Sequence, residues 1–179
     1  KRAEQELAEK EALLSTALTN MSDGIFVLDA DQRFVMFNAN YAELIEVPPG
    51  VVEIGKPLFD VALCAAGMGL YGPGLPEDQA RKRLEQYANE QSFRSEAVTP
   101  SGRILEIRKS PVRDGGAVVA LTDITERKRA EEAFQESEAR LINAIESISD
   151  GFIYYDSDER LVLCNQKYRD YYPWIDDVL

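Results

Sequence analysis

Residues 121–127, with the sequence LTDITER, contain the point at which a strand is expected to become a long charged helix. The preceding residues 116–121 (GAVVAL) form a short, largely β-branched run after a Gly-Gly turn signal, which indicates a buried strand. Residues 126–148 contain neither Pro nor Gly and are rich in Glu, Ala, Arg and Leu, so they are predicted to be helical. The side chains that follow the spacing of a left-handed coiled coil are Phe134, Ser137, Leu141, Ala144 and Ile148. A displacement of this strand could therefore move the helix.

The chain contains an internal repeat with an offset of 127 residues. Residues 1–4 (KRAE) recur at 128–131, and residues 14–41 align with residues 141–168. The 11 identities in these 28 positions are Leu14, Ala17, Ser22, Asp23, Gly24, Asp29, Asp31, Arg33, Val35, Asn38 and Tyr41. A repeat of this length indicates a duplicated domain with its linker rather than a solenoid. We expect a linker helix at 1–19, a domain at 20–125, a second linker helix at 126–147 and the N-terminal part of a second, truncated domain at 148–179.

Composition and charge restrict the class of protein. The hydrophobic fraction of 45% is sufficient for a packed core, and the net charge of -12 argues against nucleic acid or an anionic membrane as a partner. Cys64 and Cys164 form no CxxC motif, which indicates a reducing compartment. No apolar run approaches the roughly 20 residues of a membrane span, and no signal peptide is visible. We therefore expect a cytoplasmic location without direct membrane insertion, in a chain that is a fragment of a longer protein.

The first half of the chain predicts a β-hairpin and a short helix. A turn signal at 22–24 precedes an apolar run, and Asp-rich residues form the hairpin turn. Asn38 can cap the helix that follows, because its side chain can accept from the free backbone N–H groups of the first turn. The expected elements are strands at 25–28 and 33–37 and a helix at 39–46.

The middle of the chain predicts two helices, at 57–66 and 76–89, and then two strands, at 92–98 and 103–109. Gly67–Gly72, between the helices, has the GxGxxG spacing of a dinucleotide-binding turn. That motif must follow a strand and open a helix, whereas here it follows a helix and runs into Pro-Gly, so we interpret it as a loop near the mouth of a pocket. In the last strand, apolar residues alternate with charged ones, which indicates one core face and one solvated face.

Two stretches resemble the PAS domain family. Residues 22–45 (SDGIFVLDADQRFVMFNANYAELI) are similar to its opening strand, Asp turn, second strand and Asn-capped helix, and residues 123–125 (Asp-Ile-Thr) are similar to its C-terminal motif. The resemblance implies an α+β fold with a five-stranded antiparallel sheet in the order 2-1-5-4-3, helices on one face and coiled-coil-like linker helices at the flanks. The two central helices resemble the extended helical region of a subgroup found in bacterial multi-PAS sensor histidine kinases. The resemblance covers one complete copy and the start of a second.

The sequence lacks the residues that would bind several cofactors known in this family. The sequence contains no histidine, which excludes a His-ligated haem and a His-based metal site or catalytic triad. Cys64 lies in Leu-Cys-Ala-Ala, which does not match the motif of a photoreactive flavin domain. No cofactor is therefore predicted, and the binding of an unidentified small ligand is left as an alternative. The candidate pocket residues are Phe26, Phe37, Asn38, Tyr41 and Phe93.

The resemblance implies a sensory or regulatory module that passes a ligand or partner signal to an output domain in the same polypeptide. The candidate relay residues are Asp123, Ile124, Thr125 and Arg127. We expect Ile124 to anchor the helix start, and Asp123 and Arg127 to pair on its first turn. A homodimer through the linker helices and a histidine kinase output are favoured. The alternatives are a ligand-free dimerisation spacer and the input module of a cyclic-di-GMP enzyme; catalysis by the chain itself is disfavoured, because no nucleophile–base pair or metal cluster is visible.

Overall fold

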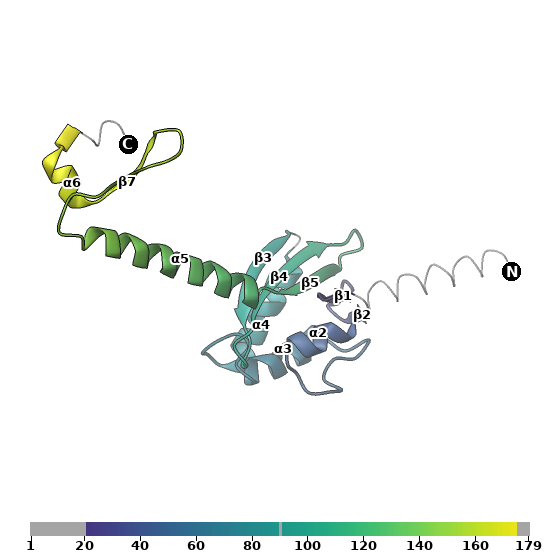
Figure 1. Cartoon of the computed structure of the whole chain (residues 1–179). Coiled ribbons are helices and arrows are strands. Elements are labelled where there is room, and N and C mark those ends of the chain that lie inside the picture. Colours follow the sequence, from purple (N-terminus) through teal and green to yellow (C-terminus); the bar gives the residue numbers. More distant parts are fainter. Residues whose placement is uncertain (1–20, 90, 175–179) are drawn as a thin grey trace. The chain divides into compact units, whose positions relative to one another are not determined.

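The computed structural model describes residues 21–89 and 91–174, and the chain divides into two compact units, up to Glu126 and from Arg127 onward. The two units are described separately. The predicted linker helix at 1–19 lies outside the described residues. Figure 1 shows the strands and helices of both units along the chain.

The first unit contains a five-stranded antiparallel sheet in the order β2-β1-β5-β4-β3, as predicted. The strands are β1 (Gly24–Leu28), β2 (Phe34–Phe37), β3 (Phe93–Val98), β4 (Ile104–Pro111) and β5 (Ala117–Asp123). β5 pairs with β1 on one side and with β4 on the other, so it is the central strand. Its alternating burial follows from the period of two in a strand, which directs every second side chain to the core.

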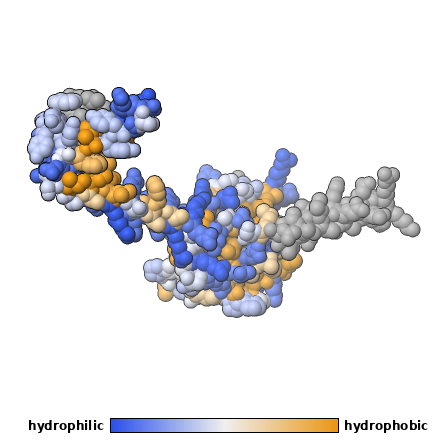
Figure 2. All heavy atoms as spheres, in the orientation of Figure 1, coloured by the Kyte–Doolittle hydropathy of each residue, from blue (hydrophilic) through white to orange (hydrophobic). Residues whose placement is uncertain are grey.

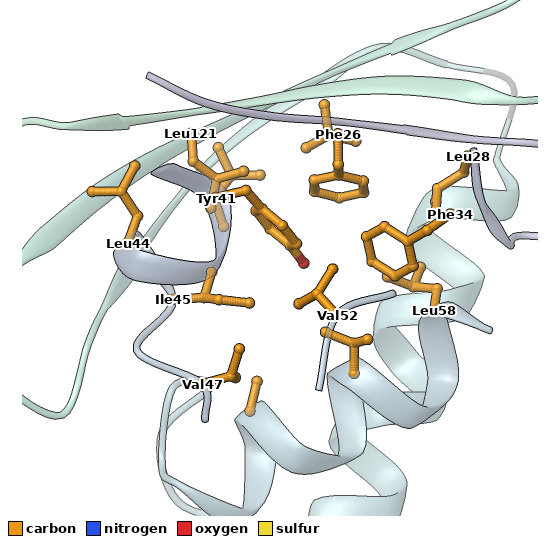
Figure 3. Packing of buried hydrophobic residues seen from close by; sticks show 14 of the residues in the cluster. Phe26, Leu28, Phe34, Tyr41, Leu44, Ile45, Val47, Val52, Leu58 and Leu121 are labelled. Atoms are coloured by element: carbon orange, nitrogen blue, oxygen red, sulfur yellow. The ribbon is translucent and has the colours of Figure 1, made fainter. Parts of the chain in front are cut away.

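Three helices pack against one face of this sheet. They are α2 (Ala39–Leu44), α3 (Leu58–Gly67) and α4 (Pro76–Ala88). Pro76 occupies the first turn of α4, where its missing N–H has no helical acceptor to lose. Figure 3 shows Phe26 from β1, Phe34 from β2 and Tyr41 from α2 pointing toward one another in the core. Their ring centroids lie 4.4–5.8 Å apart, the range of stabilising aromatic contacts.

Two charged residues of β4 are buried, although the alternation predicted that its charged residues face solvent. Glu106 is 4% exposed and Lys109 is 2% exposed. Lys109 lies on the same side of the strand as Ile107, because residues two apart share a face. Its long apolar stem lies along the core, and its ammonium donates to backbone carbonyls after α4. Glu106 lies on the opposite face, where Arg94 and Arg108 form ion pairs with it.

The second unit contains α5 and a small hairpin with a helix. The elements are α5 (Thr125–Glu146), which begins at the end of the first unit, β6 (Ile153–Tyr155), β7 (Leu161–Cys164) and α6 (Gln166–Tyr171). α5 has 22 residues, covers most of the range predicted for the second linker helix and ends two residues before Ile148. Its role as a linker stays a prediction. Of the predicted coiled-coil positions, Phe134 is 70% exposed and Leu141 is 62% exposed. In Figure 2 hydrophobic atoms are visible on the surface of both units.

Across residues 21–89 and 91–174, no helix combines the length and the apolar character that crossing a bilayer requires.

Candidate functional site

The junction between β5 and α5 is held by side-chain and backbone hydrogen bonds. Asp123 Oδ1 accepts from the backbone N–H of Thr125 at 2.9 Å and from its hydroxyl at 2.5 Å. The carboxylate therefore satisfies a free N–H at the helix start, where negative charge is also favourable for the helix dipole. The same Thr125 Oγ1 accepts from Ile104 N of β4 at 2.8 Å. One threonine thus connects the end of β5, the start of α5 and the start of β4.

Backbone contact and burial add to this connection. Ile124 N donates to Ile104 O at 2.8 Å, so Ile104 both donates to Thr125 and accepts from the residue before it. Ile124 and Thr125 are both buried. Ile124 is thus buried in the first unit just before the helix start, and its role as an anchor of the helix stays a prediction. The pair between Asp123 and Arg127 stays a prediction.

The predicted pocket residues lie in the core and at its edge, and Phe26 pairs with Phe37 across β1 and β2. Phe26 and Tyr41 are in contact within the core, with ring centroids 4.4 Å apart. Asn38 instead caps α2: its Oδ1 accepts from Ile25 N at 2.9 Å and from Tyr41 N at 3.1 Å. Phe37 and Phe93 are partly buried at the edge of the core cluster. Of the five predicted residues, Phe26 and Tyr41 belong to the buried hydrophobic core.

The interior contains a small cavity of about 20 Å³. This volume is close to the minimum that holds one water molecule. Its lining residues are Phe26, Tyr41, Ile45, Leu58, Leu70, Tyr71, Arg83, Tyr87, Ala97, Leu105, Ile107 and Leu121. In this conformation the core is closed, and a larger ligand requires side chains to move.

Polar groups at the interior cavity come from α2, α4 and the loop after α3. The guanidinium of Arg83 lies 4.4 Å from the ring centroid of Tyr71, a cation–π distance. Burial raises the pKa of Tyr41, Tyr71 and Tyr87, so these phenols stay protonated at neutral pH. The cavity therefore offers hydroxyl groups and one cation to a polar ligand. Arg83 and Tyr87 were not predicted as site residues, although their i, i+4 spacing on a predicted helix places them on one face.

A second cavity, of about 360 Å³, lies between the end of α4 and the β4–β5 hairpin. Its lining residues are Tyr87, Ala88, Asn89, Lys109, Pro111, Val112, Arg113, Gly115 and Gly116. Tyr87 lines both cavities. This cavity could not be predicted from the sequence, because its residues come from two segments at least 20 positions apart that only the fold brings together.

Comparison with known proteins assigns the family. The family model described as PAS fold matches residues 18–132. The chain is a PAS-fold protein. A curated relative, the non-motile and phage-resistance protein of Caulobacter vibrioides, is 45% identical over 47 residues, which are 26% of this chain and 6% of that protein. The chain thus matches only a small part of this relative's length.

The solved structures to which this chain is similar include two PAS domains. That of an HTR-like protein from Haloarcula marismortui is 17% identical, with a TM-score of 0.47 over 69% of this chain and 98% of that chain. The PAS domain of Bordetella pertussis BvgS is 18% identical, with a TM-score of 0.47 over 74% of this chain and 98% of that chain. A domain of a sensory box sensor histidine kinase/response regulator from Geobacter sulfurreducens is 19% identical, with a TM-score of 0.41 over 65% and 96%. A PAS domain is a sensory signalling module, and residues 18–132 of this chain form one.

Proposed function

We propose that this PAS domain transmits a signal to an output domain of the same polypeptide through the β5–α5 junction. The observation that carries the proposal is the position of Thr125, which hydrogen-bonds to β4 and to the last residue of β5 while it starts α5. A shift of either strand changes the geometry of these bonds. The first turn of the helix must then follow the strands or lose the bonds.

The proposed mechanism is a population shift between two conformations of the sheet. Val119 and Leu121 of β5 belong to the core on which the helices pack. A ligand or partner that binds one conformation more tightly increases its population. To move a two-state equilibrium from 1:99 to 99:1, the affinities for the two states must differ by about 10⁴-fold. The domain itself needs no catalytic residue for this task, and we propose no enzymatic activity for it.

The output domain and the partner are part of the proposal. A cytoplasmic histidine kinase is the favoured output, and a cyclic-di-GMP synthase or phosphodiesterase is the alternative. We propose that two copies associate through α5, because Phe134 and Leu141 are exposed at coiled-coil spacing. A homodimer would bring two output domains together, so that a rotation of the helices would act on both of them.

A second candidate function is a dimerisation spacer that binds no ligand. The observation that favours it is the closed core, whose interior cavity holds only about 20 Å³. A spacer keeps two chains in register without responding to a small molecule. The two functions predict different effects of a substitution at the junction.

The test compares Thr125→Val with Thr122→Val in the full-length protein. Thr122 lies in β5, three residues before Thr125, and its hydroxyl accepts from Arg108 at 3.3 Å. The relay predicts that Thr125→Val removes most of the signal-dependent change in output activity, whereas Thr122→Val retains it. Thermal unfolding of both variants serves as the stability control. If Thr125→Val changes stability but not the signal response, the spacer is the better account.

A further inference from the structure

Lys109 is a buried cation whose described hydrogen-bond partners are neutral. Its Nζ donates to the carbonyl oxygen of Asn89 and, at 3.5 Å, to that of Gln91. Burial lowers the pKa of Lys109, because an ammonium loses solvation in the interior. The contacts place positive charge near the C-terminal end of α4, where the helix dipole favours it. An ammonium has three donors, and two of them have acceptors among the described residues.

Two cationic side chains line the cavity beside Lys109. Arg113, in the β4–β5 hairpin, is the second cation in its lining. Among the described residues that line the cavity there is neither Asp nor Glu. In a chain with a net charge of -12, two cations without a lining carboxylate form an unusual local environment. Such a cavity attracts anions, because its charges act across low-dielectric walls.

The shape of the cavity is fixed by glycines in the hairpin. A Cβ atom at Gly116 would lie 2.1 Å from the carbonyl oxygen of Leu28, so no other residue fits there without moving the backbone. Gly115 has a φ of +84°, which favours glycine as well. The hairpin therefore passes close to β1 and leaves space over Lys109. The volume of about 360 Å³ lies within the range of small-molecule sites.

We propose that this cavity binds a small organic anion, with its carboxylate or phosphate group on Lys109 and Arg113. The remaining donor of Lys109 and the guanidinium of Arg113 provide charge-assisted hydrogen bonds. The ring of Tyr87 and the side chains of Pro111 and Val112 provide apolar contact for the body of the ligand. The site is separate from the interior cavity at the centre of the fold. Binding there does not depend on whether the domain transmits a signal.

Residues of α4 and β4 that line the site also contact the core and β5. Tyr87 also contacts Phe93, with ring centroids 5.4 Å apart, and lines the interior cavity. Pro111 pairs with Ala117, the first residue of β5. An anion in the cavity would therefore contact residues at the end of the sheet opposite to Thr125.

The experiment titrates the whole chain with benzoate, phenyl phosphate and benzyl alcohol, and follows backbone amide resonances by NMR. Benzoate and phenyl phosphate test the two anionic groups, and benzyl alcohol is the uncharged control. We expect saturable shifts at Asn89, Gln91 and the hairpin residues 112–116 with at least one anion at concentrations up to about 10 mM, and none with the alcohol. The anion that binds more tightly identifies the class of charged group.

Two charge-removing variants distinguish anion binding in the cavity from non-specific attraction of anions to the protein surface. Arg113→Gln removes a cation of the site, and Lys82→Gln removes an exposed cation of α4 that does not line it. We expect Arg113→Gln to weaken anion binding by about tenfold and Lys82→Gln to leave it unchanged. Lys109→Met should abolish binding, and circular dichroism checks that this variant folds. The proposal is wrong if neither anion shifts these resonances, or if Arg113→Gln and Lys82→Gln weaken binding equally.

Discussion

The two hairpin–helix segments, β1–β2–α2 and β6–β7–α6, have the same local structure in different surroundings. Asn38 Oδ1 accepts from Ile25 N at 2.9 Å and from Tyr41 N at 3.1 Å. At the positions 127 residues later, Asn165 Oδ1 accepts from Phe152 N at 2.8 Å and from Tyr168 N at 3.0 Å. The turns also agree, because Asp29 and Asp156 each bond two backbone N–H groups. This agreement favours the proposed second copy.

The segments differ in what covers their apolar side chains. Leu28 is 2% exposed in the first segment, whereas its equivalent Tyr155 is 49% exposed. The first segment packs against α3, α4 and the rest of the sheet, which the described part of the second unit does not contain. The buried asparagine is nevertheless present in both. The polar turn and cap therefore form from local sequence, whereas burial of the apolar face depends on distant segments.

The largest expected difference between the segments follows from removing an aromatic core residue. Phe26→Ala leaves a cavity among Phe34 and Tyr41 and should reduce the free energy of unfolding by about 3–5 kcal/mol. The equivalent change, Ile153→Ala, should cost about 1 kcal/mol or less, because Ile153 is only partly buried. Urea denaturation followed by circular dichroism measures both. Equal losses would show that the second segment has a comparable core.

The capping asparagines give a smaller and more local contrast. Asn38→Ala leaves buried backbone N–H groups without an acceptor and should cost about 2 kcal/mol. Asn165→Ala breaks the same bonds, yet it should leave the main unfolding transition unchanged, because the first unit has a core of its own. Hydrogen exchange at Tyr41 N and Tyr168 N should increase in the respective variants. A loss of the main transition in Asn165→Ala would contradict the separation of the units.

The carboxylate of Glu46 has no equivalent in the second segment. Its equivalent position is Pro173, whereas the Glu46 carboxylate accepts from Thr99 Oγ1 at 2.9 Å and from Ser101 N at 3.1 Å. Burial acts to raise the pKa of Glu46, but hydrogen bonds from Ser101 and Thr99 and the charge of Arg103 outweigh it and lower the pKa. The carboxylate thus stabilises the fold above the usual pKa of a glutamate, and this stabilisation is lost as the pH falls through the lowered pKa.

The matching variant is Glu46→Gln, which should reduce the free energy of unfolding by about 1–2 kcal/mol at neutral pH. Because a glutamine does not titrate, the difference from the original chain should shrink as the pH falls below the usual carboxyl range. Unfolding by urea at a series of pH values measures this difference. A difference that is independent of pH would show that the Glu46 charge does not contribute.

Pattern and turn chemistry in the sequence predict most of the fold, since β1, α2 and β5 begin and end within two residues of the expected positions. The strand order came from the family resemblance. The burial of Lys109 was not predictable from alternation, because a long side chain on the core face can reach carbonyls beyond it. Arg83 and Tyr87 were missed for a related reason: which side of a mainly polar helix faces the core depends on tertiary packing. Asn38 was assigned to a pocket, although its Ncap position had already indicated the bonds it makes.

The most direct test of the relay compares two neighbouring valines of β5 by amide NMR. Val119 is buried on the core face, and Val118 is exposed on the other. The account predicts that Val119→Ala shifts the resonances of the first two turns of α5, that Val118→Ala does not, and that Thr125→Val suppresses the response to Val119→Ala. If α5 does not respond to Val119→Ala, or responds equally with Thr125→Val, the junction does not couple the core to the helix.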